Sequence, residues 1–124
     1  MTRTDARTFR PSPFRMERAD DDGVQVLVVF GEIDIVTAPA FGAELQALHR
    51  NAPAVLDFCA TDFMDSSGLA VLLDQARSFP ASSLHLACEP DGPLTRLLRM
   101  AHTHHALQVH GSRDEALEAA HSMP

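Results

Sequence analysis

Between residues 14 and 30, the pattern of apolar and polar positions predicts two strands joined by a tight turn. Apolar and polar side chains alternate over 14–18, the turn-forming sequence Asp-Asp-Asp-Gly follows at 20–23, and 24–30 is almost entirely β-branched or aromatic. We therefore predict an antiparallel hairpin whose second strand is too apolar to be exposed on both faces. Shorter runs of the same kind predict three further strands, at 54–58, 84–87 and 107–110.

Apolar residues at helical spacing fill the segments between these strands. The three predicted stripes are Phe41, Leu45 and Leu48; Leu69, Leu72, Leu73 and Ala76; and Leu94, Leu97, Leu98 and Ala101. Pro39 falls in the first turn of the first helix and Pro93 just before the third, where a missing N–H does no harm. Ser112 and Glu115 form a capping box that predicts a last short helix.

This order of elements predicts an α/β fold. Strand, helix, strand units force parallel pairing with right-handed crossovers, so we expect a mixed sheet of about five strands. The N-terminal hairpin is its antiparallel part, the rest is parallel, and strands paired in chain order place the helices mainly on one face. Residues 1–12 lack a periodic apolar pattern and are predicted to be a mobile N-terminal arm, leaving 13–124 as a single domain.

Composition and charge narrow the classes of partner. With 45% apolar residues and no run of about 20 apolar residues, the chain is expected to be soluble, without a membrane contact. No secretory signal opens the sequence, so we expect a cytoplasmic protein. The formal charge of −7, with arginine as the only cation besides histidine, argues against nucleic acid as a partner. Cys59 and Cys88 suggest no disulfide framework, and we interpret them as ordinary thiols, with a redox pair as the alternative.

The sequence Asp65-Ser66-Ser67-Gly68 stands where the third predicted strand ends and the second helix begins. Ser66 is predicted to be the N-cap, a role worth about 1 kcal/mol. Capping explains neither the second serine nor Gly68, since glycine costs a helix about 0.5 to 1 kcal/mol relative to alanine. We interpret the glycine as keeping the surroundings of Ser66 open. A nucleophilic serine is disfavoured because the Gly-x-Ser-x-Gly elbow is missing. A third interpretation is phosphorylation of Ser66, with the phosphate on free N–H groups of the helix start.

Three stretches together resemble a known family. They are GEIDIVTAPAF at 31–41, VLDF at 55–58 and DFMDSSGLAVLL at 62–73. They are similar to the STAS domains of bacterial anti-sigma factor antagonists, in which Gly-Glu-Leu/Ile-Asp, Thr-Ala and Asp-Ser-Ser/Thr-Gly-Leu recur in this order. The resemblance extends from about Phe14 to Ala120 and implies a STAS-type single domain.

The resemblance implies a partner-switching module that is not an enzyme and needs no cofactor. Its unphosphorylated form would bind an anti-sigma factor that is also a serine kinase of the GHKL type, and so release a sigma factor. Phosphorylation of Ser66, with Ser67 as a possible second site, would end that binding, and a PP2C-type phosphatase would restore it. The partner-binding residues that it implies are Asp34, Thr37, Asp65, Ser66, Ser67, Gly68 and Leu69.

The resemblance is also compatible with two other functions. The same kind of domain serves as a cytoplasmic subunit of membrane transport systems for lipids or anions, where it makes a permanent contact. It also forms stressosome-like scaffolds, although those usually carry an additional N-terminal domain. The segments 78–83 and 102–105 depart from the family pattern, so the resemblance does not fix the shape of the third and fourth helices.

Three histidines and three aspartates are candidate metal or acid–base groups. His102, His104 and His105 lack the i, i+4 spacing with which one helix face binds zinc, so no metal is predicted. Asp34, Asp57 and Asp65 are all expected at strand ends near Ser66. We interpret them as groups that hold loops and present Ser66 to a kinase, with ordinary surface aspartates as the alternative.

Overall fold

The computed structural model describes residues 13–100 and 107–122, and it begins with the predicted hairpin. Strand β1 (Arg15–Asp21) pairs antiparallel with β2 (Val24–Ile33). The turn residues Asp22 and Gly23 both have positive φ, 52° and 90°, as a two-residue turn that follows the strand twist requires. The prediction of a hairpin is confirmed, and β2 continues beyond residue 30 to Ile33.

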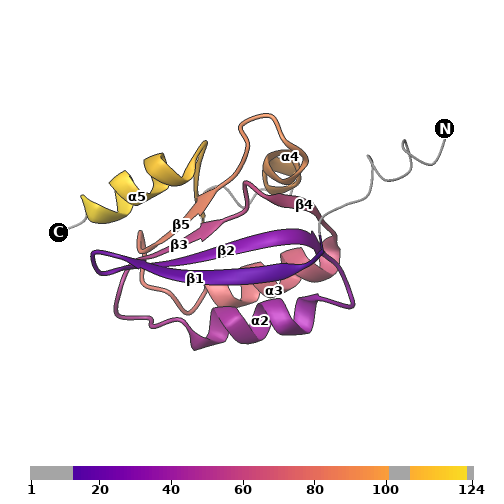
Figure 1. Cartoon of the computed structure of the whole chain (residues 1–124), viewed down its shortest axis with the longest axis horizontal. Coiled ribbons are helices and arrows are strands. Elements are labelled where there is room, and N and C mark those ends of the chain that lie inside the picture. Colours follow the sequence, from indigo (N-terminus) through magenta and orange to yellow (C-terminus); the bar gives the residue numbers. More distant parts are fainter. Residues whose placement is uncertain (1–12, 101–106, 123–124) are drawn as a thin grey trace.

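The sheet has the strand order β1-β2-β3-β5-β6, and every pair after the hairpin is parallel (Figure 1). The later strands are β3 (Ala54–Asp57), β5 (Leu84–Ala87) and β6 (Gln108–His110). A sixth strand, β4 (Thr61–Met64), pairs in parallel with the last part of β2. The sequence analysis did not predict β4, because its four residues show no alternation and two of its side chains are exposed. The mixed α/β sheet itself is confirmed.

In the described part of the chain, three helices cover one face of the sheet and one covers the other. Helices α2 (Ala38–Ala47), α3 (Ser66–Ala76) and α4 (Pro93–Met100) share the larger apolar core. Helix α5 (Arg113–His121) packs on the opposite face through Ala116 and Ala120, as its place in Figure 1 shows. The prediction of helices mainly on one face is confirmed. Helix α5 follows the last strand and makes no crossover, so the handedness rule does not assign it a face.

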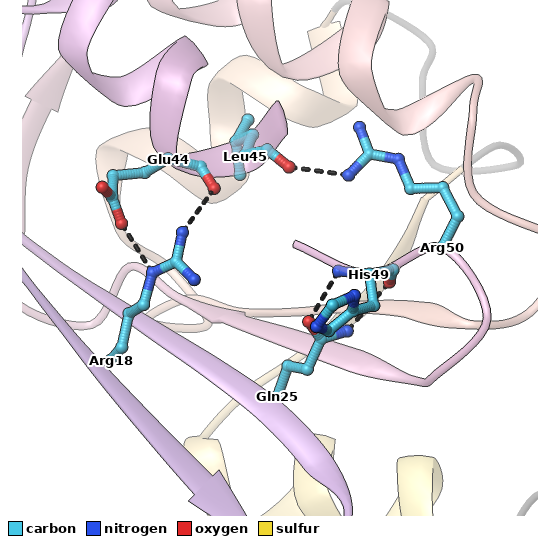
Figure 2. A network of polar contacts seen from close by, with 6 residues as sticks. All are labelled: Arg18, Gln25, Glu44, Leu45, His49 and Arg50. Atoms are coloured by element: carbon cyan, nitrogen blue, oxygen red, sulfur yellow. Dashed lines mark hydrogen bonds and ion pairs between the residues drawn. The ribbon is translucent and has the colours of Figure 1, made fainter. Parts of the chain in front are cut away.

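Polar contacts fix helix α2 against the hairpin (Figure 2). Arg18 of β1 donates from Nε to Glu44 Oε1 at 2.7 Å. The Gln25 amide pairs with the backbone of His49: Nε2 donates to the His49 carbonyl at 2.9 Å, and Oε1 accepts from the His49 N–H at 2.7 Å. These bonds join the start of β2 to the segment after α2. They fix α2 against β2, whose other end, at Ile33, lies beside Asp65 of the serine motif.

Candidate functional site

The start of α3 is capped by Asp65, not by Ser66. Asp65 Oδ1 accepts from the backbone N–H groups of Ser67, at 2.8 Å, and of Gly68, at 3.1 Å. Asp65 has extended backbone dihedrals, and Ser66 is the first helical residue. The prediction that Ser66 is the N-cap was wrong by one position. Aspartate and serine are about equally good caps, so the sequence alone does not decide between neighbours.

The hydroxyl of Ser66 stands free on the surface. The side chain is exposed, and within the described part of the chain it forms no hydrogen bond, whereas Ser67 is half-buried. Because the Asp65 carboxylate already occupies two N–H groups of the helix start, a phosphate on Ser66 would not receive those two bonds, contrary to our expectation. It would lie beside a carboxylate, with its charge directed to solvent or to a docked protein.

Gly68 allows α3 to approach the sheet closely. A Cβ at this buried position would lie 2.6 Å from Ile33 Cγ2 and 2.9 Å from Met64 Cγ, and both neighbours are buried. Such distances are shorter than any normal van der Waals contact. The glycine therefore permits the contact of α3 with β2 and β4, rather than keeping the surroundings of Ser66 open.

A Gly68→Ala variant is expected to lose about 1 to 2 kcal/mol of unfolding free energy. The overpacking against Ile33 and Met64 outweighs the helix preference of alanine, which is worth at most about 1 kcal/mol. Gly42→Ala in α2 is the matched control. Its Cβ would meet only Val71 Cγ1, at 3.1 Å, and Val71 is partly exposed and can move. Urea unfolding of both variants tests the difference, and equal stability of the two would contradict this role of Gly68.

The loop after β2 is held in place by Asp34 and Thr37. Asp34 Oδ1 accepts from the N–H groups of Val36 (2.9 Å) and Thr37 (3.0 Å). Thr37 Oγ1 accepts from the Asp34 N–H and donates to the Glu32 carbonyl, each at 2.9 Å. The backbone hydrogen bond from Thr37 lowers the pKa of the Asp34 carboxyl. Both residues therefore have a structural role in ordering the loop, whatever contacts they make with a partner.

The ordered loop presents two apolar side chains that the sequence analysis did not select. Ile35 is 74% exposed and Val36 is 79% exposed. The loop is adjacent to the serine motif, because β2 and β4 are parallel neighbours and the Asp65 N–H donates to the Ile33 carbonyl at 3.0 Å. Ile35, Val36 and Ser66 thus lie near the carboxyl ends of the parallel strands β2 and β4. We call these three residues the serine face. The signal that could have identified Ile35 and Val36 in the sequence is a pair of adjacent apolar residues in the loop that follows a strand.

The remaining predicted residues do not form a second reactive site in the described structure. Leu69 is half-buried against the main core. We had expected Asp57 to lie near the serine motif. Instead, its buried carboxylate accepts from Arg113 Nε of α5 at 2.6 Å and anchors that helix. Burial raises the pKa of the Cys59 and Cys88 thiols to about 12, which makes them poor nucleophiles.

Two further observations concern metals and membranes. The histidines at 102, 104 and 105 lie outside the described residues. Among residues 13–100 and 107–122, no group of three or more His, Cys, Asp or Glu side chains is placed to hold a metal ion. In the same ranges, no helix has the length and apolar character needed to cross a bilayer.

An α/β domain of this topology, with an aspartate-capped serine motif where β4 meets α3, is the arrangement of a STAS domain. The chain belongs to this family: the family model described as Mlab, STAS domain, matches residues 16–109. Two strains of Mycobacterium tuberculosis have an anti-sigma-F factor antagonist, RsfB, that is 36% identical over 64 residues. That alignment covers 50% of this chain and about half, 52%, of the relative.

Solved structures agree with the fold. An anti-sigma factor antagonist from Mycobacterium paratuberculosis superposes with a TM-score of 0.81 at 27% identity, over 91% of this chain and 98% of that one. The phosphorylated form of the Bacillus cell fate determinant SpoIIAA superposes with a TM-score of 0.60 at 22% identity, over 86% and 97%. A sulfate transporter family protein from Wolinella succinogenes gives 0.66 at 18% identity, over 83% and 88%. The last two likenesses concern the fold alone.

Proposed function

We propose that this chain is an anti-sigma factor antagonist that works by partner switching. Its unphosphorylated form binds an anti-sigma factor that is also a GHKL-type serine kinase, and the sigma factor is released. Phosphorylation of Ser66 abolishes the binding, and a PP2C-type phosphatase restores it. The observation that carries the proposal is the exposed Ser66 side chain on a capped helix start, whose hydroxyl forms no hydrogen bond with the described residues. The likeness to RsfB and to the M. paratuberculosis antagonist supports the same role.

The serine face supplies both the apolar surface that contacts the partner and the phosphorylation site that controls this contact. Burying Ile35 and Val36 against a partner removes apolar surface from water, at about 25 cal/mol per Å². Because Asp34 and Thr37 hold their loop in place before binding, little conformational entropy is lost on docking. A phosphate on Ser66 would add about −1.5 to −2 charges next to this apolar contact. The chain contributes no catalytic group; ATP and magnesium belong to the kinase.

Phosphorylation in vitro tests the proposal. Incubation with ATP and candidate GHKL-type anti-sigma factors, followed by mass spectrometry, is expected to find one phosphate on Ser66. Ser67→Ala should retain phosphorylation and Ser66→Ala should lose it, since the Ser67 side chain is half-buried beside the Asp65 cap. Modification of Ser67 alone, or of neither serine by any such kinase, would contradict the proposal. The latter outcome would favour the rival function, a permanent subunit of a lipid or anion transport system.

A further inference from the structure

A groove lies between β4 and α4, next to the serine motif in sequence but outside the serine face. Its volume is about 270 Å³, and it is lined by Phe63, Met64, Pro93, Leu94, Arg96, Leu97 and Met100. All of these side chains except Arg96 are apolar. Two of them are unusually exposed for large apolar side chains, Phe63 at 46% and Met100 at 77%. The groove therefore offers room for an apolar side chain from outside.

Among the residues that the structure describes, the one charged side chain that lines this groove, Arg96, is opposite in sign to the net charge of the chain. The protein carries a formal charge of −7, yet α4 contains two arginines and no acidic residue. Arg96 lines the groove, and its guanidinium donates to the backbone carbonyl of Asp91 at 3.2 Å. In the described part of the chain, Arg96 forms no ion pair with a carboxylate. A carboxylate from another molecule is the natural complement to this cation.

We infer that the β4–α4 groove is a docking site for an acidic, amphipathic segment of a partner protein. A large apolar side chain of that segment enters the groove against Phe63, Leu97 and Met100, and a carboxylate beside it pairs with Arg96. Apolar anchors flanked by charge give such contacts both affinity and orientation. The groove shares Met64 with the packing under Gly68, so it adjoins the start of α3. The inference does not depend on phosphorylation of Ser66.

A pair of synthetic helical peptides tests the inference with the whole chain. One carries leucines at i, i+3, i+4 and i+7 with glutamates elsewhere, and the other has lysines in place of the glutamates. Titration by fluorescence anisotropy is expected to show saturable binding of the acidic peptide and at least about tenfold weaker binding of the basic one. Backbone NMR shifts should concentrate in β4 and α4. Equal binding of both peptides, no saturable binding, or shifts confined to other elements would overturn the inference.

Matched variants separate the groove from general charge and apolar effects. Arg96→Glu and Arg99→Glu change the net charge equally on the same helix, but Arg99 lines a different cavity, between α4 and β6. We expect about a tenfold loss of acidic-peptide affinity for Arg96→Glu and a clearly smaller one for Arg99→Glu. Met100→Gln should weaken binding of the acidic peptide. Ile35→Ser, at a similarly exposed apolar site outside the groove, should leave that binding unchanged.

These variants also distinguish the groove from the proposed function. Loss of kinase binding in Ile35→Ser with intact peptide binding would show two separate surfaces. Equal effects of Arg96→Glu and Arg99→Glu would overturn the groove site even if Ser66 is phosphorylated. Self-association of the chain in sedimentation experiments, abolished by Met100→Gln, would identify a second copy as the occupant and would also overturn the inference.

Discussion

A Ser66→Asp variant is expected to bind its anti-sigma factor partner about a hundredfold more weakly than the wild type, with an unchanged circular dichroism spectrum. A hundredfold loss corresponds to about 2.7 kcal/mol. A unit charge about 5 Å from a like charge, at an effective dielectric constant near 20, costs on the order of 3 kcal/mol. Charge alone is therefore sufficient, and no rearrangement of the domain is required. The fold tolerates the change because the Ser66 side chain is exposed and makes no hydrogen bond to residues 13–100 or 107–122 that the substitution would break.

Ser66→Asn is the matched control, because asparagine has nearly the shape of aspartate and no charge. It should reduce the affinity by much less than Ser66→Asp, and titration calorimetry of both variants against the same partner measures the difference. High salt should recover part of the Ser66→Asp loss, since ions screen charges near a protein surface. Similar losses for both substitutions would indicate that shape, not charge, controls the contact and would contradict the proposed switch.

Arg50→Ala is expected to lower the free energy of unfolding by about 3 kcal/mol, the largest effect on stability that we predict. The half-buried guanidinium joins the ends of two helices, as Figure 2 shows for its bond to Leu45. Its hydrogen-bond acceptors, at 2.7 to 2.8 Å, are Leu45 O, Leu48 O, Gln75 Oε1 and Ser78 Oγ. It also lies 4.2 Å above the ring of the buried Phe79. Truncation leaves the last carbonyls of α2 without these donors and removes the link to α3.

Two control variants separate the geometry of Arg50 from its charge. Arg50→Lys keeps the charge but lacks the planar set of donors, so it should lose most of the same free energy. Arg77→Ala removes an exposed arginine from the end of α3, without a described ion pair, and should change stability by less than about 0.5 kcal/mol. Chemical unfolding of the three variants provides the test. If Arg50→Lys had the same unfolding free energy as the wild type, the charge of Arg50 and not its set of hydrogen bonds would hold the two helices together.

The elements that could be predicted from the sequence are those whose signal is local. The hairpin was recognisable because Asp22 and Gly23 supply the positive φ values that its turn needs. Helices α2 and α3 were recognisable because their apolar residues repeat at helical spacing. Strand β4 has no such signal. It exists because β2 is long enough to pair first with β3 and then, from Gly31 onward, with β4, with a register shift between Gly31 and Glu32.

The candidate site could also be predicted from the sequence only in part. The position of the serine motif at a helix start follows from the sequence, but the identity of the capping residue depended on backbone dihedrals that Asp65 and Ser66 can both adopt. Asp57 was assigned to the wrong neighbourhood because alternation in a strand fixes that a side chain changes face, not which helix it meets. Its partner, Arg113, is 56 positions away in the sequence.

By itself, the sequence determined the order of the strands and helices apart from β4, the hairpin and the parallel part of the sheet, and the motif that contains Ser66, since each depends on periodicity or on residues close along the chain. Only the tertiary structure decided that Gly68 is a packing residue, that Ile35 and Val36 stand exposed beside Ser66, and that Arg96 borders an apolar groove. These features depend on which segments meet across the sheet. Contacts between distant segments are set by packing of the whole domain, which no local pattern records.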